Sequence, residues 1–425
     1  MNKFDYLIKG NNLQASLLAY YLQLAGKKVI LVSENDFGSV LQSDPFFILD
    51  NISEKTAKYL FNISANTFIP VQNIEFDLNK NSLKQVSNFF MCKTGISKSE
   101  YSNKKILELT EPLVKKSNYK YGIVKHTYKY QYHRLSLEFV LAAQEKGASV
   151  YNYSNFESVG NECFKIISQN ESFEVRAEKI IYTNSNEQAN IKLSVIPRYR
   201  FELRNSLDIS GKDFSLQLIP NFSTVVIKTS SEISGKQILN VLNNEFGKQL
   251  VDADILEEHL ISNQNESVYN INGEQIYFKE GNIEQSLFST QKFIKENIDP
   301  EFDIFKLTEG LFYNFDFDKD SEVILDKVES GYREMEQIGL QPGAYTQLFY
   351  RYGNKFLELA DIAFEYYQKP ETRVNAWIIA EIIYSKQNEY CTSFEDFYYR
   401  RSNLHYSRFF DSELKKEVAD LFKIF

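Results

Sequence analysis

The chain has 425 residues, of which 25% are charged and 43% hydrophobic, as in soluble globular proteins. A net charge of −9 at pH 7 argues against a general nucleic-acid binder, which needs clustered Lys and Arg. The three cysteines and four histidines have no ligand-like spacing, so we expect no metal site. No apolar run reaches the ~20 residues of a membrane span, and no signal peptide is recognisable. We therefore expect a cytoplasmic protein.

The first recognisable unit covers residues 5–37 and reads DYLIKGNNLQASLLAYYLQLAGKKVILVSENDF. A short apolar run leads to Gly10, an apolar-rich segment of helical length reaches Ala25, and a second apolar strand covers 29–32. Strand, tight turn, helix and strand within about 30 residues predict a βαβ unit of the dinucleotide-binding type.

The turn of such a unit normally reads G-x-G-x-x-G/A, and an acidic residue normally ends the second strand. Here Gly10, Asn12 and Ala15 occupy the three turn positions, and Ser33 stands where the carboxylate is expected. Glu34 follows directly, but adjacent strand residues face opposite sides. These five residues are the candidate cofactor-binding positions.

Beyond this unit, residues 37–64 mix polar and apolar residues around Pro45. Residues 66–91 and 100–118 have no clean period, and we expect loops, short strands and one short helix in these two segments. After residue 120, local patterns predict further elements. They are a strand at 121–124, an amphipathic helix at 134–146 that stops at Gly147, a strand at 149–153, hairpin-like strands at 156–184, strands at 195–230, a helix at 238–246 and a strand-rich segment at 260–290.

The last quarter of the chain has a helical pattern. A Ser-capped helix is expected at 321–337, and 339–343, with two glycines and a proline, is the best linker candidate. Four helical segments follow, at 344–367, 371–390, 393–401 and 411–423. The sequence thus predicts an α/β body at 1–338 and a small all-helical domain at 344–425.

Three stretches together resemble the FAD-dependent glycerol-3-phosphate dehydrogenases and oxidases, within the D-amino-acid-oxidase-like superfamily. The first is VILVSENDFGS, at the end of the opening unit. The second is residues 111–159, with its HRLSLEFVLAAQEKGA core. The third combines LQPGAYTQLFYRYGNKFLELA with AEIIYSKQNEYCTSFEDFYYRRSNLHY, which contains Glu395, Asp396, Arg400 and Arg401.

The resemblance implies a Rossmann-like FAD domain from about 1–50, 110–195 and 305–338. It also implies an interleaved antiparallel substrate sheet mostly at 195–300, and a helical C-terminal domain of a kind that is often an interaction module. The implied cofactor is FAD. The implied reaction oxidises glycerol 3-phosphate to dihydroxyacetone phosphate by hydride transfer to flavin, and peripheral membrane contact occurs in the family.

The chain departs from the family pattern at positions that contact ligands. The side chain of Asn12 would sit where the pyrophosphate should, and the hydroxyl of Ser33 is a weaker ribose partner than a carboxylate. The family's glycines are also missing around 40–47 and 182–186, and its late G-G-K turn is replaced by a segment with one glycine, EGLFYN at 309–314. The family's G-x-R-P segment has no counterpart near 260–275. We therefore expect weakened or absent FAD binding and an interaction or regulatory role. The alternative is a working FAD-dependent oxidoreductase acting on glycerol 3-phosphate or a related small hydroxy or amino substrate.

Candidate residues for a substrate phosphate are Arg198 and Arg200, with Arg204 following, in IPRYRFELR. Their alternating spacing predicts one face of a strand, which is either a phosphate site or a solvated surface. His126 and His133 are the histidines near the core segments of the body. Each is a candidate general base, with a structural role as the other interpretation.

Overall fold

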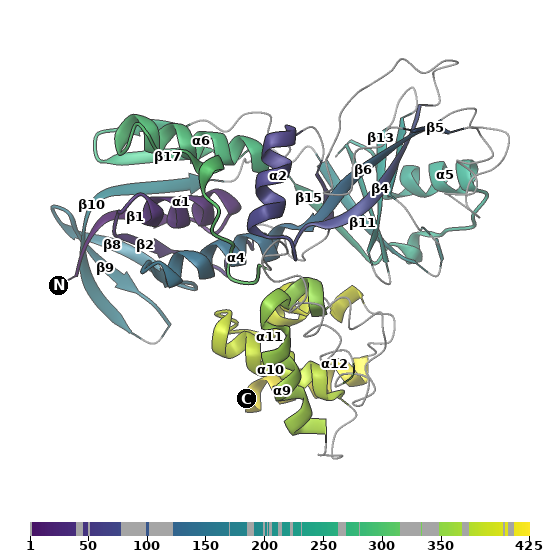
Figure 1. Cartoon of the computed structure of the whole chain (residues 1–425). Coiled ribbons are helices and arrows are strands. Elements are labelled where there is room, and N and C mark those ends of the chain that lie inside the picture. Colours follow the sequence, from purple (N-terminus) through teal and green to yellow (C-terminus); the bar gives the residue numbers. More distant parts are fainter. Residues whose placement is uncertain are drawn as a thin grey trace.

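The structure is a computed structural model of the chain. It describes residues 2–39, 46–49, 52–77, 99–101, 122–169, 171–184, 191–198, 200–201, 203, 206–210, 215–221, 224–230, 232–261, 269–279, 281–314, 333, 348–367, 374–402, 404–406 and 412–425. Two sheets and one helical domain make up this part of the chain (Figure 1).

The first sheet, on the left of Figure 1, has eight strands in the order β16–β17–β10–β1–β2–β7, and β10 also pairs with β9, which pairs with β8. Strands β17, β10, β1, β2 and β7 are parallel. The four residues of β2 are fully buried, as expected in the middle of a parallel sheet. The strands are β1 (Asn2–Lys9), β2 (Val29–Val32), β7 (Ser149–Tyr151), β8 (Asn155–Gly160), β9 (Cys163–Ile167), β10 (Ser172–Asn184), β16 (Tyr269–Asn272) and β17 (Gln275–Lys279).

Three helices cover one face of this sheet, with α1 (Leu13–Leu24) packed against both α4 (Tyr132–Glu145) and α6 (Ile283–Asn297) (Figure 1). Because α1 is enclosed on several sides, its first ten residues are all buried. Helix α2 (Glu54–Ile63) packs into the same core. On the opposite face, Phe164 and Ile166 of β9 pack in one cluster with the β1 and β2 side chains.

The second sheet has nine strands in the order β15–β11–β14–β13–β12–β4–β6–β3, with β5 also paired to β6. Helix α5 (Gly235–Phe246) packs against it. Strand β6 runs directly into α4, so the first turn of α4 lies where the two sheets meet. The strands are β3 (Phe46–Ile48), β4 (Ile69–Asp77), β5 (Ser99–Tyr101), β6 (Gly122–Gln131), β11 (Ile191–Pro197), β12 (Ser206–Ser210), β13 (Ser215–Asn221), β14 (Thr224–Ser230) and β15 (Glu257–Ile261).

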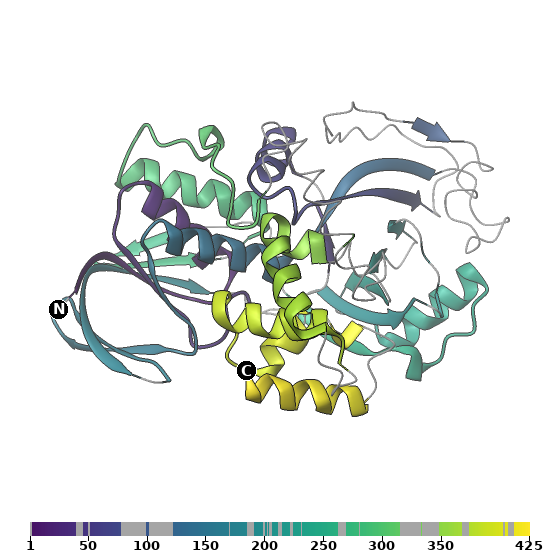
Figure 2. The same ribbon diagram turned by 60° about the horizontal axis from the view of Figure 1, so that its bottom comes forward.

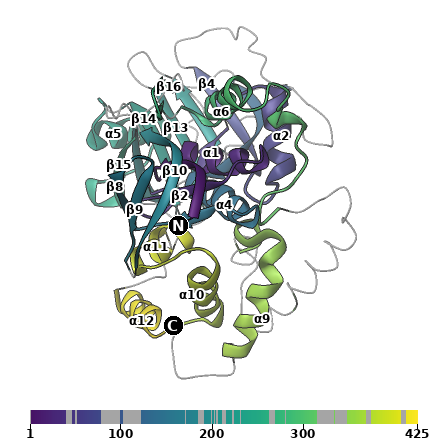
Figure 3. The same cartoon turned by 90° about the vertical axis from the view of Figure 1, so that its left-hand side faces the viewer.

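The helical domain lies below α2 and α4 in Figure 1 and comes forward in Figure 2. Figure 3 shows its α11 end next to the first sheet. Its elements are η3 (Gly353–Lys355), α9 (Phe356–Tyr367), α10 (Ala376–Asn388), α11 (Phe394–Asp396), the π-helical turn η4 (Phe397–Arg401), η5 (Leu404–Tyr406) and α12 (Ser412–Ile424). No helix in the described part of the chain has the length and apolarity needed to cross a bilayer.

The predicted fold class is confirmed: an α/β body with one largely parallel and one largely antiparallel sheet carries a helical C-terminal region. The sheet assignment differs from the prediction in two places. Strands at 46–48 and 122–131, predicted for the FAD-type part, belong to the second sheet. Strands β16 and β17 and helix α6, predicted within the substrate sheet, belong with the first. Both differences arise because the chain passes between the sheets more often than the local patterns indicate.

Two element predictions were wrong. Helix α2 was not predicted, although Ser53 caps it by accepting the Thr56 N–H. The segment from residue 283 onward is helix α6, not strand, and begins with a capping box of Asn282 and Gln285. The predicted helix at 321–337, except Arg333, and the linker at 339–343 lie outside the described residues.

Candidate functional site

The turn after β1 brings the predicted cofactor positions to the N-terminus of α1. Asn12 is the N-cap residue, and its side-chain Oδ1 accepts the backbone N–H of Ala15 over 3.0 Å. Asn12 is only 1% exposed. Its amide therefore occupies the start of the helix, where a dinucleotide-binding unit presents free N–H groups to phosphate.

A second group of the chain reaches the same helix end. The backbone N–H of Leu13 donates to the hydroxyl of Tyr132, 2.8 Å away, at the first residue of α4. Sequence reasoning missed Tyr132. The two partners are 119 positions apart in the sequence, so no local pattern connects them.

Gly10 is needed for close packing between the ends of two strands. A Cβ at this position would lie 1.8 Å from Oγ1 of Thr183, at the end of β10. The backbone of the turn thus approaches a neighbouring strand of its own sheet. This close packing explains why a glycine stands at position 10, with or without a bound nucleotide.

The two residues after β2 are also engaged within the chain. Ser33 is fully buried, and its hydroxyl donates to the carbonyl of Asn35 over 2.6 Å. Glu34 is half-exposed and pairs with Lys9 at 2.6 Å, while Lys9 also donates to Asn155 at 3.1 Å. The hydroxyl proton of Ser33 is thus bonded within the loop, and the Glu34 carboxylate is paired with Lys9.

FAD in this fold class depends on free N–H groups at the first helix and on a carboxylate after the second strand. Here Asn12 and Tyr132 take the N–H groups of Ala15 and Leu13, and the Ser33 hydroxyl is bonded to its own loop. The residues present do not fit FAD in that arrangement.

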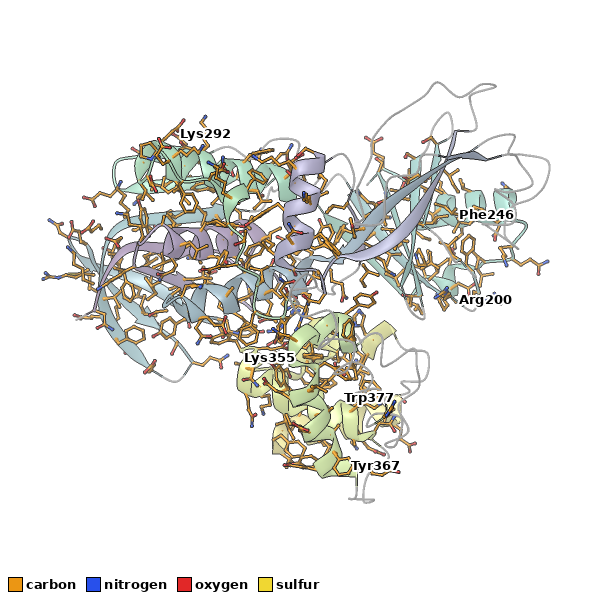
Figure 4. All side chains as sticks on the ribbon, viewed as in Figure 1. Arg200, Phe246, Lys292, Lys355, Tyr367 and Trp377 are labelled. Atoms are coloured by element: carbon orange, nitrogen blue, oxygen red, sulfur yellow. The ribbon has the colours of Figure 1, made fainter. Side chains whose placement is uncertain are left out.

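The two arginines predicted for a substrate phosphate do not lie on a strand face. Strand β11 ends at Pro197, and a turn follows in which the Arg200 N–H donates to the Pro197 carbonyl. Arg200 forms a bidentate pair with Asp254, Nε–Oδ1 2.8 Å and Nη2–Oδ2 3.1 Å. Figure 4 shows Arg200 near Phe246 in the second-sheet region, far from the first sheet. This contradicts the predicted geometry.

Arg198 lies near Lys129 of β6. Burial, and then the charge of Arg198, lower the pKa of Lys129 from 10.5 to about 8. The Lys129 ammonium donates to the carbonyl of Pro220 over 2.9 Å. Two basic side chains thus lie close together in the second sheet.

The three stretches that carry the family resemblance meet at one buried cluster, which we call the Asp36 cluster: Asp36, His133, Arg400 and Arg401. Both carboxylate oxygens of Asp36 accept from Arg401, at 2.8 and 2.9 Å, and Oδ2 also accepts from Arg400 at 3.0 Å. Arg401 Nη1 further donates to His133 Nε2 at 2.5 Å. All four side chains are buried.

The cluster continues into the helical domain and along α4. Arg401 Nη2 donates to the carbonyl of Glu389 at 2.7 Å, and the Glu389 carboxylate accepts from Arg134 at 2.7 Å and from the Tyr313 hydroxyl at 2.5 Å. The Arg134 guanidinium lies 4.2 Å from the ring centroid of Tyr313. Charged groups from the body and the helical domain therefore compensate one another in the interior.

The charges of this cluster set its protonation. Burial would raise the pKa of the Asp36 carboxyl, but the Arg401 guanidinium holds it well below its usual value. Burial, and then the charge of Arg401, lower the pKa of His133 well below 6.5. The imidazole of His133 is therefore neutral, and its Nε2 lone pair accepts from Arg401, which favours the structural interpretation. The side chain of His126 lies outside the described residues, within which no cluster of His, Cys, Asp and Glu could hold a metal.

Residues 326–423 match the family described as the C-terminal domain of alpha-glycerophosphate oxidase. A comparison with curated proteins finds no match. Glycerol-3-phosphate dehydrogenase from Bacillus halodurans, complexed with FAD, is similar in structure, with a TM-score of 0.75 and 16% identity over 99% of this chain and 94% of that chain.

Two further solved structures are similar at a coarser level. Glycine oxidase from Bacillus cereus has a TM-score of 0.50 and 12% identity, over 73% of this chain and 99% of that chain. L-alpha-glycerophosphate oxidase from Mycoplasma pneumoniae has a TM-score of 0.49 and 12% identity, over 74% and 98%. The resemblance found in the sequence is thus confirmed: the chain has the fold of the FAD-complexed glycerol-3-phosphate dehydrogenase, and its helical domain matches the C-terminal domain of alpha-glycerophosphate oxidase.

Proposed function

We propose that this protein is a divergent relative of the FAD-dependent glycerol-3-phosphate dehydrogenases that does not hold FAD in the manner of that fold. It acts as an interaction or regulatory protein. One observation carries the proposal: Tyr132 and Asn12 accept the N–H groups of Leu13 and Ala15 at the start of α1. A pyrophosphate needs those groups, because the helix N-terminus supplies its hydrogen bonds.

Opening this site would cost free energy. Each of the two hydrogen bonds contributes about 0.5–1.5 kcal/mol, and the Asn12 side chain would also have to leave a buried position. No carboxylate after β2 would offset this cost, because the nearest one, on Glu34, is paired with Lys9.

We propose that the partner protein binds to the helical domain. Four large apolar side chains are exposed there, on Phe364 and Tyr367 of α9 and on Ile424 and Phe425 at the end of α12. The rings of Tyr366 and Phe425 pack edge to face with their centroids 5.4 Å apart, which brings the two helix ends together. Tyr367 lies at the end of the domain that points away from the body (Figure 4).

The test is the absorption spectrum of the purified full chain, followed by thermal unfolding with added FAD. We expect a colourless protein whose melting temperature FAD does not change. A ligand at 100 times its Kd would add ~2.7 kcal/mol to the stability and would raise the melting temperature. Flavin absorbance at near-stoichiometric amount would overturn the proposal.

A second candidate is an FAD-dependent oxidoreductase that binds its cofactor through other contacts. Two observations favour it: the similarity to the FAD-complexed dehydrogenase covers 99% of this chain, and Lys129 and Arg198 bring two cations together in the second sheet. Reduction of a dye by glycerol 3-phosphate in the presence of FAD would support this candidate. The interaction protein should give no dye reduction.

A further inference from the structure

The two arginines of the helical domain that enter the Asp36 cluster are neighbours in the sequence. They lie on the π-helical turn η4, where the Ser402 N–H donates to the carbonyl of Phe397 at 2.8 Å. Adjacent side chains of an α-helix point about 100° apart. On this wider turn Arg400 and Arg401 both reach the same carboxylate.

Asp36 belongs to the loop after β2. This loop contacts the turn before α1 and the first turn of α4. The Gly38 N–H donates to the carbonyl of Asn11 at 2.5 Å, and Asn11 donates through its amide to Ser39 at 3.1 Å. Gly38 has a φ of +75°, and a Cβ there would lie 3.1 Å from the Cα of His133. The loop is therefore packed tightly between α1 and the first turn of α4.

The first turn of α4 connects the cluster to the helix end. His133 accepts from Arg401, and the preceding residue, Tyr132, accepts the N–H of Leu13. We infer that Arg400 and Arg401 are positioning residues, through which the helical domain holds the 33–39 loop and Tyr132 against the N-terminus of α1. This inference rests on the proposed function, because it explains what keeps the nucleotide site closed.

The arrangement couples the two parts of the molecule. A partner that draws the helical domain away from the body would remove two cations from Asp36 and one donor from His133 in the same step. The contact between Tyr132 and Leu13 would weaken with them, and the start of α1 would open. Coupling of this kind is reciprocal, so an anion that opens α1 would loosen the helical domain.

Hydrogen exchange of the full chain, without FAD, tests the inference through two amides: Leu13, bonded to Tyr132, and Gly38, bonded to Asn11. Arg401→Lys keeps the charge but loses the bidentate contact with Asp36. We expect exchange of both amides to rise at least about tenfold, with the amides of β13 and β14 unchanged. Where Arg401→Lys does not fold, Arg400→Lys takes its place, since it leaves the contacts of Arg401 intact.

Two further variants separate the steps. Tyr132→Phe should raise exchange of Leu13 alone and leave Gly38 protected. Arg200→Lys is the matched control, because it alters a bidentate Arg–Asp pair in the second sheet and should leave both amides unchanged. Wild-type exchange at Leu13 and Gly38 in both cluster variants would overturn the inference. So would a uniform rise that includes β13 and β14.

The outcome is independent of the flavin experiment. If the wild type binds FAD, and exchange of Leu13 and Gly38 still rises in the cluster variants, the proposed function is refuted and the coupling remains. If the wild type is colourless, and exchange of the two amides does not change in the cluster variants, the coupling alone is refuted.

Discussion

The hydroxyl of Tyr132 accepts the backbone N–H of Leu13 over 2.8 Å, across 119 residues of sequence. A phosphate oxygen would occupy a comparable position in a dinucleotide-binding unit. With Asn12 capping the same helix end, the protein satisfies by its own side chains two of the N–H groups that a cofactor would otherwise bind. These two N–H groups therefore have partners within the chain.

The close approach of Gly10 to Thr183 gives the first prediction. Gly10→Ala places a Cβ 1.8 Å from Thr183 Oγ1 and should destabilise the protein by about 1–3 kcal/mol in urea unfolding. Thr183→Ala removes that oxygen, so the double variant should recover most of the loss. Equal destabilisation in the single Gly10→Ala variant and the double variant would show that the contact is not the cause.

The Asp36 cluster gives the second prediction. Asp36→Asn leaves the buried cations of Arg400 and Arg401 without their shared carboxylate and should cost about 3–5 kcal/mol of unfolding free energy. The matched control is Asp420→Asn, which breaks an exposed pair with Lys423 and should change stability by less than about 1 kcal/mol. Similar losses in the two variants would contradict the assigned role of the cluster.

The third prediction concerns pH. Burial raises the pKa of Glu381 from 4.5 to about 7 although Arg351 pairs with it. Between these values the folded protein holds a proton that the unfolded chain releases, so this group lowers the stability as pH rises from 4.5 to 7. Glu381→Gln should remove that contribution, at most ~1.4 kcal/mol per pH unit. Urea unfolding at several pH values measures it, and an unchanged slope would refute the assignment.

The fourth prediction concerns Lys129, whose pKa burial and Arg198 lower to about 8. Reductive methylation with ¹³C-formaldehyde and an NMR titration should show one lysine that titrates well below the others and is absent in Lys129→Arg. Arg198→Ala should raise the pKa of Lys129 only in part, because burial is the larger cause. A signal that titrates near 10.5 would contradict the structure.

The same shift affects stability. Between pH 8 and 10.5 Lys129 binds a proton in the unfolded chain but not in the folded protein, so its contribution to the free energy of unfolding increases as pH rises.

Local sequence patterns correctly predicted the helices and strands that are determined by neighbouring residues. The βαβ unit follows from two short apolar strands and a helix of the right length. The helix predicted at 134–146 is α4, and the hairpin-like strands predicted at 156–184 are β8 to β10. That Asn12 caps this helix was not predicted, although Asn is a common N-cap residue.

Relationships over long sequence separations could not be predicted in this way. Asp36 and Arg401 are 365 residues apart, and no periodicity links them. The predicted strand face for Arg198 and Arg200 was wrong because the strand ends at Pro197, where a turn begins. Alternation in sequence indicates a common face only while the strand continues.

The most direct test of the closed nucleotide site is a titration of FAD, followed by flavin fluorescence, into wild type and into the variant Asn12→Gly/Ser33→Glu/Tyr132→Phe. The variant frees the N–H groups of Leu13 and Ala15 and adds a carboxylate after β2. We predict no saturable binding to the wild type and measurable binding to the variant. Saturable FAD binding to the wild type at one equivalent would contradict the account.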